Sequence, residues 1–209
     1  MVNAKRAIAL QQRLRGRVER RDRIGRVRRI AGIDVSIHNG RARAAVVVMN
    51  PALEVLETST AEVRATFPYI PGLLAFRELP AITRAYRALE RKPELVVVDG
   101  HGFAHPRRFG IACHVGVEFD VASIGCGKSL FVGEHAPPAP RRGSWTKLRH
   151  RGETVGAALR TRDGVRPVYV STGHRVSLAT AIRWILRLSP RYRLPEPIRA
   201  ADALAGEIA

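Results

Sequence analysis

Two aspartates lie on predicted strands at positions where their carboxylates could bind a metal ion. Asp34 stands inside the segment Ala-Gly-Ile-Asp-Val-Ser-Ile, so strand alternation puts Ile33 and Val35 on one face and the carboxylate on the other. Asp99 follows the apolar segment Leu-Val-Val-Val, at the carboxyl end of a strand, where open α/β sheets bind their ligands. If the two strands are neighbours, the carboxylates converge, and they then repel one another unless a cation lies between them.

A third carboxylate, Glu78, lies on a helix that is predicted to follow a proline-rich loop. It is the natural third ligand, although its spacing alone fits an ordinary solvated helix residue better. Mg²⁺ prefers a few oxygen ligands and keeps several waters, and Mn²⁺ is the alternative ion. Such a site suits phosphodiester hydrolysis, because the ion lowers the pKa of a bound water and neutralises charge on the phosphate. The pattern therefore predicts a metal-dependent nuclease.

Zinc is an alternative metal, because three histidines and two cysteines fall within one short stretch of the chain: His101, His105, Cys113, His114 and Cys126. Their spacing fits no standard zinc pattern, and Cys113 and His114 fall in a predicted apolar helix. A serine or cysteine nucleophile is a further alternative, but the sequence contains no G-x-S-x-G elbow. We therefore expect Mg²⁺.

The charge of the chain indicates its partner. The 209 residues include 36 Lys and Arg against 18 Asp and Glu, a formal net charge of +18. A phosphate backbone would balance this excess, whereas a genome that favours arginine is the simpler alternative. We expect nucleic acid and no membrane, because no apolar run approaches the roughly 20 residues of a membrane span. With no secretory signal and no dense cysteine framework, we expect a cytoplasmic protein and a monomer.

The elements that would position these carboxylates begin with a basic N-terminal helix within residues 1–30, which leads into a strand at 31–37. Asn39-Gly40 is a strong hairpin signal, and further strands are predicted at 44–49 and 53–60. Together these strands would form an antiparallel meander.

The second half of the chain alternates helices and strands. A helix at 73–91 with a kink at Pro80, a strand at 94–98, a helix at 108–119 and a strand at 121–124 predict a parallel crossover. Residues 133–152 have the composition of an irregular basic connection. Strands at 155–160 and 167–171 and helices at 176–188 and 198–208 complete the prediction. We therefore expect a single α/β domain over residues 1–209, with a mixed sheet of the ribonuclease-H-like type flanked by helices.

Three segments can be compared with known families: Gly32-Ile-Asp-Val-Ser36, Phe67-Pro-Tyr-Ile-Pro-Gly-Leu-Leu-Ala-Phe-Arg-Glu78 and Val98-Asp-Gly-His-Gly-Phe-Ala-His-Pro-Arg-Arg-Phe-Gly110. They closely resemble the endonuclease V family, the deoxyinosine 3′ endonucleases. Later segments at 125–129, 169–174 and 193–199, with Asp202, match the family's downstream motifs in order. The likeness covers residues 32–202, and the second and third motifs are too long to match by chance.

The resemblance implies a DNA-repair endonuclease that recognises inosine. It would hydrolyse the second phosphodiester on the 3′ side and leave 3′-hydroxyl and 5′-phosphate ends. Asp34 and Asp99 match the metal-binding aspartates of the family, and Glu78 matches the carboxylate that completes the metal site or positions its water. Lys128 matches the lysine beside the scissile phosphate, and His174 matches a histidine at the same site. Asp202 would be an outer fourth carboxylate.

The resemblance also implies a base-recognition pocket. Tyr69 would be the tip of a wedge at the lesion, and four further residues would shape a pocket for the rotated base: Leu74, Gly100, His105 and Gly110. Cys126-Gly127, Ile37-His38 and Thr172 depart from the family pattern, which leaves base selectivity open.

The sequence leaves open two alternative functions and the choice between DNA and RNA as substrate. A binding module of the same fold would grip nucleic acid without cutting it, and a resolvase-like or transposase-like nuclease would cut without regard to inosine. DNA and RNA carry the same phosphate and the same hypoxanthine, so the sequence leaves the working substrate undecided.

Overall fold

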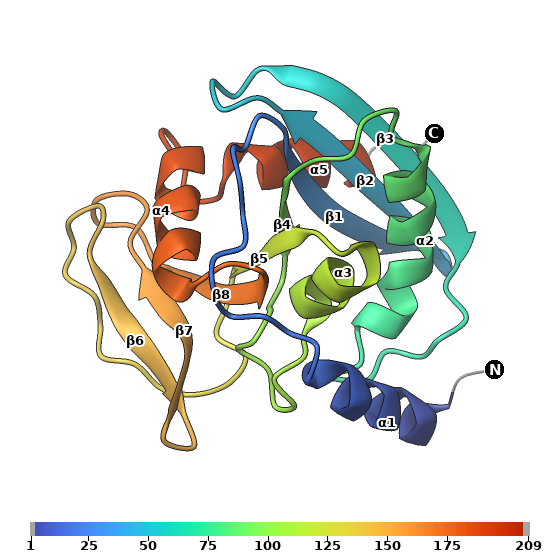
Figure 1. Cartoon of the computed structure of the whole chain (residues 1–209), viewed down its shortest axis with the longest axis horizontal. Helices are drawn as coiled ribbons and strands as arrows, with labels where there is room; N and C mark the ends of the chain where they lie inside the picture. The colour runs from blue at the N-terminus through green and yellow to red at the C-terminus, as the bar shows by residue number, and fades with distance from the viewer. Residues whose placement is uncertain (1–2, 207–209) are drawn as a thin grey trace.

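The computed structural model describes residues 3–206, and one eight-stranded sheet with the order β3-β2-β1-β4-β5-β8-β7-β6 organises them (Figure 1). The strands are β1 (Ile30–His38), β2 (Arg41–Met49), β3 (Val55–Arg64), β4 (Leu95–Asp99), β5 (Ala122–Gly127), β6 (Trp145–His150), β7 (Glu153–Leu159) and β8 (Val168–His174). The helices are α1 (Ala4–Arg15), α2 (Ala75–Ala88), α3 (Ile111–Phe119), α4 (Leu178–Leu188) and α5 (Glu196–Gly206).

The first three strands form the antiparallel meander that the sequence predicts. Asn39 and Gly40 join β1 to β2, and both have positive φ, at 48° and 73°. Two successive positive φ angles are what a two-residue turn between twisted strands requires, which explains why this pair starts the hairpin.

The strands β1, β4 and β5 are parallel neighbours, as the predicted crossover requires. Ile33 pairs with Val98, so Asp34 and Asp99 each stand one residue beyond the same pair. The remaining strands pair antiparallel, β5 with β8, β8 with β7 and β7 with β6. This mixed arrangement is ribonuclease-H-like, and the predicted fold class is confirmed.

Each face of the sheet has its own core, and β4 shows the division. Val96 and Val98 pack in the core beneath α2 and α3, whereas Leu95 and Val97 pack in the core beneath α4 and α5. Continued alternation puts Asp99 on the α4 and α5 face, and Asp34, which follows Ile33 of the first core, lies on that face too.

Two predicted segments were wrong in their extent. The N-terminal helix ends at Arg15 rather than continuing towards residue 30, because the backbone of Glu19 and Arg23 bonds instead to that of Arg175. The connection at 133–152 contains the edge strand β6, whose only buried residue is Leu148, so its apolar pattern was too weak to predict a strand.

The termini extend past the described part of the chain. The last helix, expected to reach residue 208, is described to Gly206, and 207–208 lie outside the described residues. The domain expected for 1–209 likewise includes 1–2 and 207–209, which are also outside them. Within residues 3–206, none of the helices combines the length and hydropathy needed to cross a bilayer.

Candidate active site

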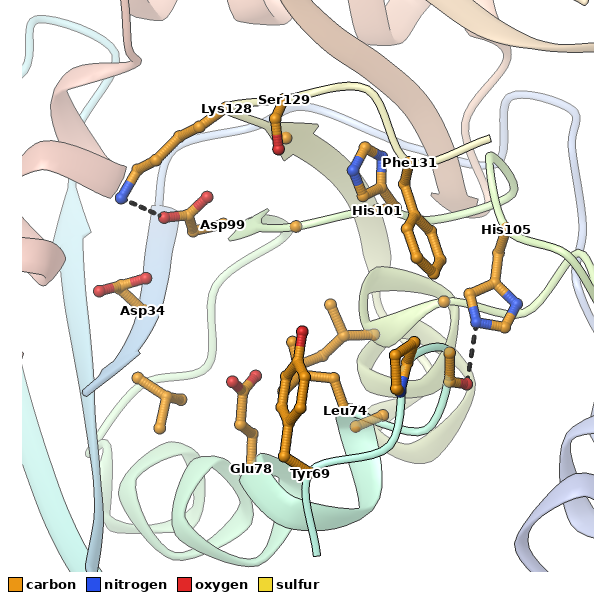
Figure 2. A pocket seen from close by; sticks show the side chains of 18 of the residues that line it. Asp34, Tyr69, Leu74, Glu78, Asp99, His101, His105, Lys128, Ser129 and Phe131 are labelled. Carbon is orange, nitrogen blue, oxygen red and sulfur yellow. Dashed lines mark hydrogen bonds and ion pairs between the residues drawn. The ribbon is translucent and has the colours of Figure 1, made fainter. Parts of the chain in front are cut away.

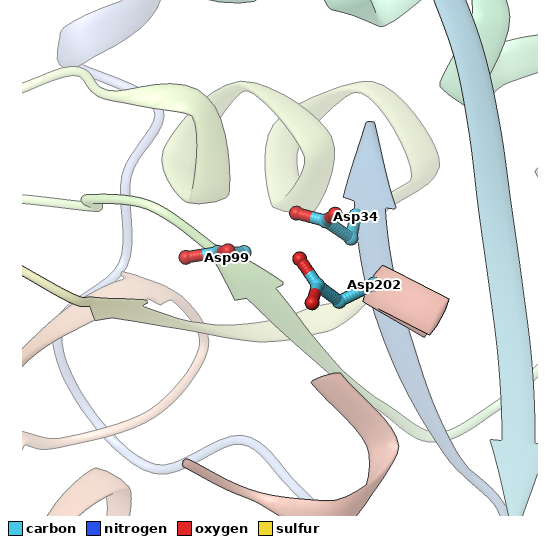
Figure 3. Close-up of side chains that lie close together, drawn as sticks. All are labelled: Asp34, Asp99 and Asp202. Carbon is cyan, nitrogen blue, oxygen red and sulfur yellow. The ribbon is translucent and has the colours of Figure 1, made fainter. Parts of the chain in front are cut away.

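Three aspartates from β1, β4 and α5 converge at the carboxyl ends of the parallel strands (Figure 3). One carboxylate oxygen from each of Asp34, Asp99 and Asp202 lies within 4.8 Å of the others. Gly32 permits this approach, because a Cβ at that position would lie 2.0 Å from the carbonyl oxygen of Pro197 in α5. The helix therefore packs directly on β1 and carries Asp202 to the two strand aspartates.

Lys128 supplies the positive charge beside these aspartates. Its Nζ lies 2.6 Å from Oδ2 of Asp99 (Figure 2). The same nitrogen lies 3.1 Å from Oδ1 of Asp202. Burial alone would lower the pKa of Lys128, but the hydrogen bond and charge of Asp99 raise it overall, so the side chain stays protonated. One ammonium cannot neutralise three carboxylates, and the group keeps an excess of negative charge.

This excess charge changes the proton affinity of the buried carboxylates. Burial, followed by the charge of Asp99, raises the pKa of Asp34 to about 7. Burial, followed by the charges of Asp34 and Asp99, raises the pKa of Glu78 to about 8. A set of hard oxygen donors with unbalanced charge fits a divalent cation such as Mg²⁺.

Glu78 lies near this group but does not belong to its closest set. It is in the first turn of α2, which covers the opposite face of the sheet from α5, and its side chain is buried. It lines the same cavity as the three aspartates. The expected third ligand therefore approaches from the other side, and Asp202 completes the group whose oxygens are within 4.8 Å.

A cavity of about 660 Å³ begins at these carboxylates (Figure 2). It extends between the proline-flanked loop at residues 67–74 and the glycine turn, residues 100–110, which joins β4 to α3. Tyr69 stands at the cavity with 67% of its surface exposed. The other residues predicted to shape a base pocket also line it: Leu74, Gly100, His105 and Gly110. Gly100 has a φ of +136°, and a Cβ at Gly110 would lie 2.2 Å from the carbonyl oxygen of His101, so both positions need glycine.

His105 is held as a neutral imidazole with a defined tautomer. Its Nε2 lies 3.0 Å from the carbonyl oxygen of Gly72, which can only accept, so Nε2 carries the hydrogen. Its Nδ1 accepts from the backbone N–H of Arg107 at 3.1 Å. Burial, followed by the charge of Arg107, lowers the pKa of His105 to about 4. His105 therefore shapes the cavity wall and does not exchange protons at neutral pH.

Several residues that line the cavity had no role predicted from the sequence, among them Gln11, Ser129, Leu130 and Phe131. Phe131 stacks on His101 with ring centroids 5.6 Å apart. Gln11 had a signal in the sequence, because it is a polar residue four positions after Ala7 on the apolar side of the first helix.

The expectation that His174 lies at this site is wrong. It pairs with Ser123 at the start of β5, whereas Asp99 pairs with Cys126 near the end of that strand, roughly 10 Å further along. His174 is buried, its Nδ1 accepts from the backbone N–H of Glu19, and it does not line the cavity. The antiparallel direction of β8 carries it to the opposite end of the sheet.

Zinc gains no support from the geometry. Cys113 and Cys126 are both free and buried, and burial raises the pKa of each thiol. Among residues 3–206, the three aspartates are the one group of acidic, histidine or cysteine side chains with ligand atoms close enough for a metal ion.

Comparison with known proteins agrees with the geometry. The endonuclease V family model matches residues 12–203. An endonuclease V from Roseiflexus sp. (strain RS-1) is 56% identical over 200 residues, which are 95% of this chain and 90% of that protein. The structure of endonuclease V from Streptomyces avermitilis superposes with a TM-score of 0.94 at 43% identity, and the match covers 98% of this chain and 92% of that one.

A more distant relative has been crystallised with nucleic acid. Endonuclease V from Ciona intestinalis, in complex with a 24mer DNA containing an inosine followed by a ribo-adenosine, has a TM-score of 0.81 at 27% identity and matches 94% of this chain and 93% of its own. With the family model spanning residues 12–203 and full-length relatives above half identity, this chain belongs to the endonuclease V family.

Proposed function

We propose that this protein is a Mg²⁺-dependent endonuclease that recognises inosine in DNA, a product of adenine deamination, and initiates its repair. It would hydrolyse the second phosphodiester on the 3′ side and leave 3′-hydroxyl and 5′-phosphate ends. The observation that carries the proposal is the position of the three converging aspartates at one end of the cavity beside Tyr69. A base held in that cavity would place the adjoining backbone beside the carboxylates.

The carboxylates and Lys128 have separate tasks in this proposal. Asp34, Asp99 and Asp202 would hold Mg²⁺, with Mn²⁺ as an alternative. When bound, the ion would supply a water of lowered pKa and neutralise charge on the phosphate. Glu78, with a pKa raised to about 8, would orient that water or hold a proton beside it. Lys128 would stabilise the negative charge that builds on the phosphate.

Base selectivity would come from the cavity wall. The volume of the cavity, about 660 Å³, is within the usual range for ligand pockets. The glycines at 100 and 110 allow the backbone to approach the base, where amide groups can read the O6 and N1 edge of hypoxanthine. Adenine would present its exocyclic amine to donors that need an acceptor, and a site built this way rejects it strongly.

The partner and assembly follow the same proposal. The net charge of +18 favours a polyanion, and the inosine-containing DNA bound by the Ciona relative supports this lesion as substrate. RNA carries the same base and phosphate and is the alternative substrate. The proposed chemistry uses residues of one chain only, and a monomer is the proposed active form.

The test compares matched DNA and RNA oligonucleotides, each with a single inosine or adenosine, in Mg²⁺ and in EDTA. We expect a Mg²⁺-dependent cut one nucleotide beyond inosine, lost in Asp34→Asn and retained in Asp163→Asn, an exposed aspartate that does not line the cavity. Uniform cutting of the adenosine strands would indicate a nuclease without base selectivity. Binding without cutting would refute the enzymatic proposal.

A further inference from the structure

Gln11 of α1 is a buried amide at the wall of the cavity, far in sequence from the site motifs. Only 1% of its surface is exposed, although glutamine is rarely buried to this extent. A buried amide is costly unless its donors and acceptor are paired, so its partners indicate what it holds in place.

The side-chain amide of Gln11 joins two loops that line the cavity. Its Nε2 donates to the carbonyl oxygens of Gly72, at 2.9 Å, and Phe109, at 3.1 Å. Its Oε1 accepts from Nε of Arg107 at 2.5 Å. Gly72 belongs to the loop that carries Tyr69, whereas Arg107 and Phe109 belong to the turn that carries His105.

The carbonyl oxygen of Gly72 is the point where these contacts meet. Besides Gln11, it accepts from a terminal guanidinium nitrogen of Arg107 at 2.6 Å and from Nε2 of His105 at 3.0 Å. Gly72 has a φ of +80°, and glycine has little backbone preference of its own, so these hydrogen bonds hold the carbonyl in its direction. Fixing it fixes the loop three residues after Tyr69.

Apolar packing holds α1 against the same loop. Ala7 is fully buried in a small cluster with Phe67 and Leu73, and Ile8 and Ile70 pack against it. Figure 1 shows α1 beside the start of α2, below the sheet. The hydrogen bonds of Gln11 therefore act on a helix that is already docked.

We propose that Gln11 is a positioning residue for base recognition, which sets the separation between the Tyr69 loop and the glycine turn. This inference rests on the proposed function, because it deepens the account of how the inosine site selects its base. Recognition by backbone groups tolerates little displacement, and a shift of about 1 Å can cost about a hundredfold in rate.

Two variants test the donor and the acceptor of the Gln11 side-chain amide. Gln11→Leu keeps the approximate volume and removes all three hydrogen bonds. Gln11→Glu keeps the acceptor for Arg107 and replaces the donor to Gly72 with an oxygen that repels the carbonyl. Gln12→Ala is the matched control, because the neighbouring glutamine is exposed on the same helix.

With inosine and adenosine oligonucleotides in Mg²⁺, we expect both Gln11 variants to lower kcat/KM for inosine about ten- to a hundredfold and to reduce the preference for inosine over adenosine. The Mg²⁺ concentration for half-maximal rate should not change, and Gln12→Ala should behave as wild type. A general loss of folded protein would lower the cleavage rates of the inosine and adenosine oligonucleotides by the same factor. Unchanged preference in folded Gln11→Leu and Gln11→Glu would overturn the proposal.

Hydrogen exchange keeps this test independent of the inosine assignment. If the wild type shows no preference for inosine, the proposed function fails, and the positioning role is judged by amide exchange alone. We expect faster exchange in residues 67–74 of both Gln11 variants, with no change in β4. Equal exchange in residues 67–74 of wild type and both variants would overturn the role of Gln11.

Discussion

The ammonium nitrogen of Lys128 lies 2.6 Å from Oδ2 of Asp99 and 3.1 Å from Oδ1 of Asp202, so Lys128 is already paired with two of the three converging aspartates. If these aspartates held a divalent ion, their negative charge would be satisfied and Lys128 would be free to pair with the phosphate. The ammonium of Lys128 therefore stands where it can exchange a carboxylate partner for a phosphate oxygen of the substrate.

Removing the charge of Lys128 should act on the chemical step. We expect Lys128→Met to lower kcat about a hundred- to a thousandfold, because the charge that builds on the phosphate loses its partner. Single-turnover cleavage of an inosine oligonucleotide measures this effect. Lys5→Met, at an exposed lysine of α1, is the control. An increase in KM with an unchanged kcat would instead assign Lys128 to ground-state binding.

Asp99→Asn should separate stability from metal binding. In EDTA we expect a melting temperature equal to or above that of wild type, because one of several mutually repelling carboxylates is removed. Mg²⁺ should raise the melting temperature of wild type and not that of the variant, since a ligand stabilises only the state that binds it. Thermal melts with and without Mg²⁺ measure both effects. A full Mg²⁺ response in Asp99→Asn would contradict the site.

Asp202 and Glu78 should differ in what they do for the ion. Asp202→Asn is expected to raise the Mg²⁺ concentration for half-maximal cleavage about tenfold, since its oxygen belongs to the close group. Glu78→Gln is expected mainly to lower kcat, because Glu78 approaches from the other face of the sheet. A Mg²⁺ titration of cleavage by each variant decides between them. The reverse pattern would make Glu78 the third ligand, as the sequence implies.

The stability of the metal-free protein should fall as the pH rises. The pKa of Asp34 is raised from 3.8 to about 7 and that of Glu78 from 4.5 to about 8. Between the ordinary and the raised values, the folded state therefore binds more protons than the unfolded chain. Their contribution is present below pH 4 and is lost as the pH passes the folded values. Burial lowers the pKa of His105 and His114 to about 4, which opposes this trend below pH 6.5. The window from pH 6.5 to 8.5 is therefore the informative one.

Melting temperatures in EDTA across that window give the slope. We expect it to be smaller in Glu78→Gln than in wild type, because one titrating carboxyl is removed. Mg²⁺ should stabilise wild type more at pH 8 than at pH 6, since the ion binds ionised carboxylates. A Mg²⁺ effect that does not change with pH would contradict the assignment of these groups to the metal site.

Tyr69→Ala should affect activity and not stability. With 67% of its surface exposed, its loss should change the free energy of unfolding by less than about 0.5 kcal/mol. Cleavage of inosine in duplex DNA should fall about tenfold or more, and cleavage in single-stranded DNA should fall less, because a wedge helps only where a base must leave its stack. Tyr192→Ala, at another exposed tyrosine, is the control. An equal loss on both substrates would contradict a wedge.

Much of the site can be predicted from local sequence. Alternation around Asp34 and the apolar run before Asp99 place both carboxylates on the same face of neighbouring strands, and the register Ile33 to Val98 agrees. The rigid loop around Tyr69 and the glycine turn follow from proline and glycine alone. These features depend on a few adjacent residues, whose backbone preferences are local.

The sequence by itself determined the fold class, the strand aspartates and the loops around the cavity, whereas the tertiary structure decided which distant residues join them. Asp202 reaches the site because α5 packs on Gly32, and Gln11 does so because α1 docks on the Tyr69 loop. His174 lies elsewhere because β8 runs antiparallel to β5. These placements depend on packing between segments that are far apart in the chain, and no local periodicity encodes the direction or register of such contacts.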